Sequence, residues 1–392
     1  MTSNTEGLQL ELFSDDILIS ASAAHDDFEP SRLTQARQLA GLTKQALGDT
    51  IGVSGAAIGQ FEAAITPPRP AVIAALAQAL HVPIAFFTSG RPLGQVDASQ
   101  AHFRSLRSTR SFERLKAASF VEWVWELSFA LEKRVQLPSP NVPSIDDSSA
   151  VMNPAEAAIA LREYWELGTG PISHLTLEME HHGIIVTSLA FSGDPGSQNR
   201  VDAFSTSALQ RPIVVTTTER STSVYRHRFT CAHELGHLIL HRDVISGDSK
   251  QEREADAFAA EFLTPRAEIE PLLPSTMNLA RLAKIGSEWG VSTESLIRRM
   301  QEIKGVTDVS VRRAYQKIRE QSALGLRQDP ATADSLGEQP SLLREAAAVA
   351  EQHGFSLVDL ANELRWPMHR VRELLGIVDK RPHLRLVQSR SD

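Results

Sequence analysis

Apolar residues recur every three or four positions along most of this chain, the spacing that is typical of amphipathic helices. Between residues 30 and 90 the pattern predicts four short helices, at 32–39, 44–51, 55–61 and 70–80. Short apolar runs predict three strands, at 183–188, 201–205 and 211–217. Helical patterns fill most of the remaining chain, so we expect a mainly α protein with a small β-sheet, in the α+β class.

Changes in this pattern divide the chain into segments. Residues 1–29 are polar and acidic without sustained periodicity, which predicts a flexible arm. We expect an all-α domain at 30–90, a helical connector at 91–143, an α+β domain with a helical end at 144–320 and a small C-terminal helical domain at 341–392. Residues 321–340 contain several Gln, Asp, Gly and Pro residues and are predicted to form a linker.

A long helix in the connector carries large apolar residues on one face. They are Phe120, Trp123, Val124, Leu127 and Leu131. An apolar face of this size needs a partner, and a second copy of the chain would supply one. A homodimer formed through this face is therefore one hypothesis.

The stretch from Arg228 to His241 contains the H-E-x-x-H pattern of zinc peptidases. His233 and His237 are four residues apart and share one face of a helix, so both imidazoles can bind one metal ion. Glu234 lies beside that face, where it can take a proton from a water held by the metal. The motif is short, and a chance match on a core helix is the alternative interpretation.

A second amphipathic helix is predicted at 252–263. Catalytic zinc commonly takes two histidines and one glutamate from the protein, and Glu252 is the predicted third ligand. Glu254 is a rival ligand, because it too could turn inward. Asp256 is placed one turn after Glu252, where it can accept a hydrogen bond from a metal-binding histidine. A solvated helix edge is the alternative for both glutamates, and Mn²⁺ would suit the same ligands as Zn²⁺.

Together the patterns R-F-T-x-A-H-E-L-G-H-x-x-L-H and E-x-E-A-D-x-F-A-x-x-F-L-x-P resemble the ImmA/IrrE family of metallopeptidases, over about Pro154 to Arg313. The resemblance implies a zincin-like α+β peptidase domain. It also implies that Glu234 is the catalytic base and that three residues hold the metal, namely His233, His237 and Glu252.

Three further residues near the metal helix are candidates for stabilising an oxyanion or binding substrate. Tyr225 and Arg228 precede the motif, and His241 continues the spacing of the two histidines by one more turn. The sequence does not choose among them, and His241 is not counted as a ligand. A sheet packed against the metal helix would offer an edge to which a substrate chain can add as an extra strand.

Residues 30–90 predict a helix-turn-helix, with Thr43 and Ser54 as helix caps. The segment closely resembles XRE-family (lambda-repressor-like) domains, which implies binding of double-stranded DNA through the second helix of the motif. The residues expected at DNA are mostly short, namely Lys44, Ser54, Gly55, Ala56 and Gln60. A dimer reading two half-sites would strengthen such contacts, and a domain kept only for protein contact is the alternative.

The composition bears on the partners and the cellular compartment that we expect. The formal net charge is −8, so any DNA contact must come from a local patch. The single cysteine, Cys231, excludes an internal disulfide framework and suits a reducing cytoplasm, and we read it as a small buried side chain. The polar N-terminus is unlike a signal peptide, and we find no apolar run long enough to cross a membrane.

Three functional hypotheses follow. The first is a DNA-binding transcriptional regulator fused to a zinc endopeptidase; the family resemblance implies that it cleaves a repressor, a partner or itself after stress or a phage-related signal. The second is a transcription factor whose peptidase-like domain only senses a metal or ligand. The third is an antitoxin-like binding protein that holds a toxin and regulates its own synthesis. The complete H-E-x-x-H motif favours the first.

Overall fold

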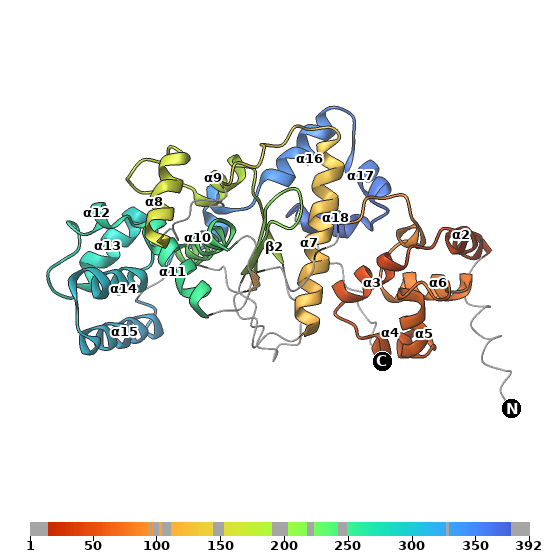
Figure 1. Cartoon of the computed structure of the whole chain (residues 1–392), viewed down its shortest axis with the longest axis horizontal. Coiled ribbons are helices and arrows are strands. Elements are labelled where there is room, and N and C mark those ends of the chain that lie inside the picture. Colours follow the sequence, from red (N-terminus) through yellow and green to blue (C-terminus); the bar gives the residue numbers. More distant parts are fainter. Residues whose placement is uncertain are drawn as a thin grey trace, which may run out of the picture.

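The computed structural model of the chain describes residues 15–94, 96, 102–103, 111–143, 153–189, 203–217, 223–241, 249–326 and 329–377. Helices dominate, and one small sheet lies near the middle of the molecule (Figure 1). The N-terminal helices lie at one end of the view and the last helices of the α+β domain at the other, with the C-terminal helices beside the sheet. The predicted α+β class is confirmed. None of the described helices combines the length and apolar character needed to span a membrane.

The four predicted helices of the N-terminal domain are present as α3 (Pro30–Leu39), α4 (Lys44–Ile51), α5 (Gly55–Glu62) and α6 (Pro70–Ala79), followed by the 3₁₀ turn η1 (Ile84–Phe87). Thr43 caps α4 by accepting from the Ala46 amide at 3.0 Å, and Ser54 caps α5 by accepting from the Ala57 amide at 3.1 Å. Gly52 ends α4 with a φ of 75°, which glycine adopts without strain.

The flexible arm predicted for 1–29 is wrong for much of its length. Residues 15–26 form helix α2 (Asp15–Asp26), which packs against α6 with Ala21 and Ala24 buried. The ring nitrogen Nδ1 of His25 lies 2.9 Å from the Pro68 carbonyl. The helix has a weak apolar stripe because its inward side chains are small, so tertiary packing holds it. Residues 1–14 lie outside the described part.

The sheet has four strands among the described residues, one more than predicted. These are β1 (His102–Phe103), β2 (Ile185–Leu189), β3 (Ala203–Thr206) and β4 (Ile213–Thr217), in the order β1-β3-β4-β2. β2 pairs with β4 in parallel, whereas β3 is antiparallel to both β4 and β1. β1 is too short to leave a period-two pattern in the sequence.

The two faces of the sheet pack against different cores. Ile213 and Val215 of β4 face the core that contains α7 (Ser111–Glu132), whereas Val214 faces the core that contains α10 (Val224–Leu240). This alternation follows from the two-residue period of a strand. The sheet therefore separates α10, the metal helix that carries the H-E-x-x-H motif, from α7, the long helix of the connector.

The remaining helices complete the two cores. The α+β domain contains α8 (Pro154–Tyr164), α9 (Leu175–His181), α11 (Ser249–Leu263), α12 (Arg266–Ile269), α13 (Leu279–Trp289), α14 (Thr293–Lys304) and α15 (Asp308–Ala323). The C-terminal domain contains the three predicted helices, α16 (Leu342–Gln352), α17 (Leu357–Leu364) and α18 (Met368–Leu374).

The apolar face of α7 is covered by the chain itself. Trp123 is 2% exposed and stacks on Trp366, with the ring centroids 4.6 Å apart. α16 and α17 pack along α7, and Arg365 donates to the Ser89 carbonyl at 2.7 Å. The proposed dimer through this face is therefore wrong, because the C-terminal domain occupies it and also contacts the N-terminal domain.

The linker predicted at 321–340 is also wrong in part, since α15 runs to Ala323 and residues 329–340 pack on the α+β domain. They contain two 3₁₀ turns, η2 (Thr332–Asp334) and η3 (Leu336–Glu338). The Glu338 carboxylate is 2% exposed and accepts from the backbone amides of Leu175 at 2.9 Å and Thr176 at 3.1 Å. A linker-like composition does not reveal that one carboxylate in it is buried and paired.

Candidate metal centre

The metal helix α10 is almost entirely buried between the sheet and α11. Gly236, inside the motif, allows α11 to come close: a Cβ there would lie 3.0 Å from the Phe258 ring and 3.3 Å from the Ala255 backbone. A larger residue would fit only if Phe258 or the α11 backbone shifted by a few tenths of an ångström. This glycine is therefore part of what brings carboxylates on α11 within reach of histidines on α10.

Three side chains converge where α10 and α11 meet. The Nε2 atoms of His233 and His237 are 3.1 Å apart, and the Glu252 carboxylate oxygens lie 3.6 Å from the first and 3.5 Å from the second. One ligand atom from each residue lies within 4.8 Å of the others. Two imidazoles and one carboxylate are a ligand set that suits zinc, so the site fits a divalent metal ion.

The charge states also suit a metal. Burial alone would raise the pKa of Glu252, but the contacts with His233 and His237 outweigh burial and hold this pKa at about 2. Burial lowers the pKa of His237, which favours the neutral imidazole that a metal requires. Glu254, the rival ligand, does not join this group.

Each histidine uses its other nitrogen for an outer partner. His233 Nδ1 lies 2.8 Å from Asp256 Oδ1, the partner expected from the sequence. His237 Nδ1 lies 3.0 Å from His241 Nδ1, and His241 Nε2 lies 3.0 Å from Glu254 Oε2. These contacts form a relay in which His237 donates to His241 and His241 donates to Glu254. This arrangement leaves Nε2 of His237 without a proton, as metal binding requires.

The predicted base, Glu234, is fully buried beside the sheet. Its Oε2 atom accepts from the Ser205 hydroxyl at 2.8 Å, and its backbone carbonyl lies 3.3 Å from the same hydroxyl. Ser205 belongs to β3 and was missed from the sequence, because only the strand register decides which side chain faces α10. The contact places β3 next to the position where a proton would be transferred.

Two of the three oxyanion candidates lie in buried networks of hydrogen bonds and ion pairs. Arg228 is 3% exposed, donates to the carbonyls of Ile172 at 2.7 Å and Gly290 at 2.9 Å, and forms a buried ion pair with Glu338. His241 is buried in the relay. Tyr225 is half-buried in the first turn of α10 and stays a prediction.

Cys231 is fully buried on α10, as expected of a packing side chain. Burial raises the pKa of its thiol, which favours the protonated, unreactive form. His227, one turn earlier, lies 3.1 Å from the Thr176 hydroxyl and 3.6 Å from the Cys231 sulfur. This second buried histidine is separate from the metal ligands.

The predicted DNA-contact residues lie on or beside α5, the second helix of the motif. Ala56 and Gln60 are exposed, and Lys44 is about half exposed. Gly55 lies close to α4, since a Cβ there would come within 3.0 Å of the Gln45 Cα atom. Ser54 is partly used as the cap of α5. Lys44 is the one charged side chain among these five predicted contacts.

Glu62 further reduces the positive charge available to DNA. It lies 3.4 Å from the Lys44 ammonium and pairs through both carboxylate oxygens with Arg37, which is nearly buried. Any phosphate contact by Lys44 would therefore compete with a carboxylate of its own domain.

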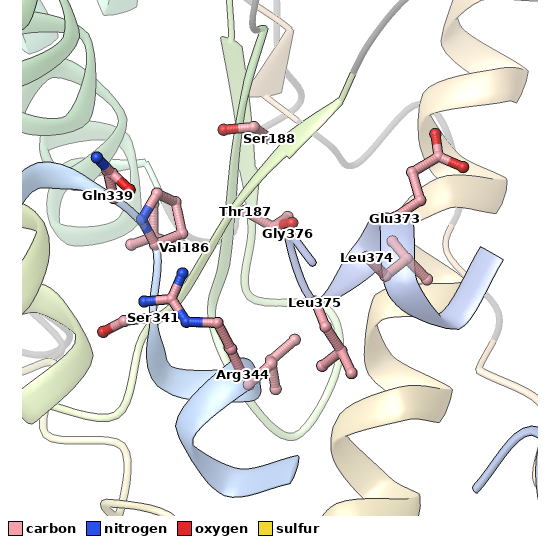
Figure 2. Close-up of a pocket in the computed structure, with 12 residues that line it drawn as sticks. Val186, Thr187, Ser188, Gln339, Ser341, Arg344, Glu373, Leu374, Leu375 and Gly376 are labelled. Atoms are coloured by element: carbon pink, nitrogen blue, oxygen red, sulfur yellow. The ribbon is translucent and has the colours of Figure 1, made fainter. Parts of the chain in front are cut away.

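A pocket of about 280 Å³ lies at the outer edge of β2. Figure 2 shows Ser188 of β2, the Arg344 guanidinium of α16 and the amide of Gln339 around it, with Leu375 from the end of α18 on another side. None of the residues that line this pocket belongs to the metal centre. It is a separate site between the sheet and the C-terminal domain.

Comparison with family models agrees with both halves of this description. Residues 31–85 match a helix-turn-helix domain, and residues 179–301, which include α10 and α11, match the IrrE N-terminal-like domain. The chain joins a helix-turn-helix domain to an IrrE-like peptidase domain. No curated protein matches it. The IrrE-like domain implies a metal ion, and the His233, His237 and Glu252 group is the place where the described residues would hold one.

Proposed function

We propose that the protein is a DNA-binding transcriptional regulator whose IrrE-like domain is a zinc-dependent endopeptidase. The substrate class is a polypeptide, namely a repressor, another partner or the chain itself, cleaved after stress or a phage-related signal. The observation that carries the proposal is the convergence of His233, His237 and Glu252, with Glu234 beside them.

The residues divide the chemistry among them. A zinc ion held by the three ligands supplies Lewis acidity to a water molecule or a peptide carbonyl. Glu234 accepts a proton from the attacking water and later donates it to the leaving amine. The Ser205 hydroxyl holds one oxygen of Glu234, which orients the carboxylate. Asp256 and His241 fix the two ligand imidazoles.

The helix-turn-helix domain supports a role at DNA. Gln60 is exposed on α5 and long enough to reach an adenine edge, whereas Ala56 can contact only a thymine methyl group. We expect modest affinity from one domain, because few cations surround α5. Replacing Gln60 by Ala should relax the sequence preference more than it lowers nonspecific binding, as measured by competition with unrelated DNA.

The test of the peptidase compares newly formed protein N-termini in cells that make the wild type or Glu234→Gln, with and without DNA damage. We expect termini that appear only with the wild type, while both proteins bind zinc equally. The matched control is Glu268→Gln, the same change at an exposed position on α12. Identical sets of termini in all three strains would refute the peptidase.

A ligand-sensing regulator is the second candidate, and the pocket beside β2 favours it. The pocket adjoins the C-terminal domain, which in turn contacts the helix-turn-helix domain through Arg365 and Ser89. A Glu234→Gln protein that retained its full regulatory effect would support this candidate over the peptidase.

A further inference from the structure

Strand β3 lies directly beside the proposed catalytic base. Ser205, at the middle of β3, contacts Glu234, and β3 packs against α10. The opposite edge of the sheet belongs to β2, which is separated from β3 by β4. A polypeptide that adds to the sheet next to Glu234 must therefore pair with β3.

That edge of β3 is already occupied by the chain itself. His102 pairs with Ser205 and Phe103 with Phe204, in antiparallel register. With β4 on one side and β1 on the other, β3 has neighbours along both edges. Glu234 is also fully buried in this arrangement. A substrate strand and β1 cannot occupy the same edge together, because each backbone group of β3 makes one ladder bond.

β1 comes from the segment that connects the helix-turn-helix domain to α7. Before it, the Val96 amide donates to the Glu122 carboxylate of α7 at 3.2 Å. After it, the chain enters α7 at Ser111. The Arg32–Glu126 ion pair, both side chains 1% exposed, holds the helix-turn-helix domain on α7. β1 therefore lies in the chain between two points that are anchored on α7, namely Val96 and the start of the helix itself.

We propose that the outer edge of β3 is the polypeptide-binding edge of the peptidase and that His102–Phe103 is its internal competitor. A substrate strand enters by displacing β1. The substrate therefore competes for this edge with the segment that connects the DNA-binding domain to α7. This inference rests on the proposed function, because it assumes that a polypeptide is the substrate. It assigns to a short connecting strand the control of access to Glu234.

The test measures binding of fluorescein-labelled β-casein, a largely unstructured polypeptide, to the zinc-loaded full chain. All proteins carry Glu234→Gln, so that binding is measured without turnover. The variant His102→Pro/Phe103→Pro removes both amide donors of β1. The matched control, Ser105→Pro/Ser108→Pro, places two prolines in the same connecting segment outside β1. A glycine pair at 102 and 103 is a milder second variant that weakens the strand and keeps the donors.

We expect casein to bind about tenfold more tightly to the 102/103 proline variant, the effect of one or two lost backbone hydrogen bonds in the competitor. The glycine pair should show a smaller gain, and the control should match the parent. Hydrogen exchange at residues 203–206 should become faster in the proline variant without casein. Equal casein affinity in the parent and both β1 variants, no casein binding to any of them, or unchanged exchange at 203–206 would overturn the proposal.

The two proposals fail separately. If casein binds more tightly when β1 is weakened but the comparison of protein N-termini finds no wild-type-specific cleavage, the peptidase is wrong and the competing strand is right. If the wild type cleaves casein and the proline variant neither binds nor cleaves it better, the peptidase stands and the competing strand is wrong.

Discussion

The relay from His237 through His241 to Glu254 leads to a quantitative prediction about metal affinity. In His241→Ala, the Nδ1–H group of His237 loses the acceptor that lies 3.0 Å away in a buried setting. The ring of His237 can then rotate, and its tautomer is no longer fixed. Losing an outer partner of a metal-binding histidine typically lowers metal affinity about 10- to 100-fold, or about 1.4 to 2.7 kcal/mol.

Variants that weaken the relay to different degrees distinguish its effect on zinc affinity from a general loss of stability of the core. In His241→Asn, the amide oxygen lies near the former Nδ1 position and can accept from His237, so most of the zinc affinity should return. Glu254→Gln keeps an acceptor for His241, and we expect a loss of less than about threefold. The control is His227→Asn, which alters another buried histidine of α10 outside the relay. It should lower the melting temperature without changing zinc affinity.

The assay is competition for zinc against a chelating dye, with the melting temperature of each protein recorded with and without zinc. The order of affinity should be wild type, Glu254→Gln, His241→Asn and then His241→Ala. If a folded His241→Ala protein bound zinc as tightly as the wild type, the role given to the relay would be refuted. If the wild type bound no zinc, the metal centre itself would be refuted.

Three further predictions concern stability. Glu338→Ala leaves Arg228 buried without its carboxylate and should lower the free energy of unfolding in urea by about 3–5 kcal/mol. The control, Asp334→Ala at an exposed position, should lower it by less than about 0.5 kcal/mol. Similar losses in the two variants would contradict the buried ion pair. Burial raises the pKa of Glu122 from 4.5 to about 7, so its stabilising contribution is full below pH 4.5 and is lost as the pH rises through 7. Glu122→Gln should therefore raise the melting temperature at pH 8 and have little effect at pH 5, and an equal shift at both would refute the assignment. Chelation of zinc should lower the melting temperature of the wild type, because the metal binds only the folded chain, and an unchanged value would count against the site.

Local patterns in the sequence were enough for the helices and for the main residues of the site. His233, Glu234 and His237 lie within five residues of one helix, so their relative placement follows from helical geometry alone. The caps Thr43 and Ser54 act on amides three residues away. Contacts of this range depend little on the rest of the chain, which is why the helix-turn-helix and the metal helix were both predicted.

Contacts between distant segments were decided only by the tertiary structure. Glu252 and Glu254 both lie on α11, and only the packing of α11 against α10 shows that Glu252 meets the two ligand histidines and Glu254 meets His241. The sequence offered Arg228 as a candidate for stabilising an oxyanion. Its buried partner, Glu338, lies 110 residues away in a segment whose composition resembles a linker, so the pair could not be predicted.

The sheet also combines features that local patterns determine with features that depend on the tertiary structure. The sequence by itself determined that three apolar runs form strands, because burial and period-two patterning are local properties. Only the tertiary structure decided that β1 closes the edge of β3, that Ser205 faces Glu234 and that the C-terminal domain covers α7. Strand order, register and the partner of an apolar face depend on chain segments that meet only after folding, and one segment's pattern does not identify its partner.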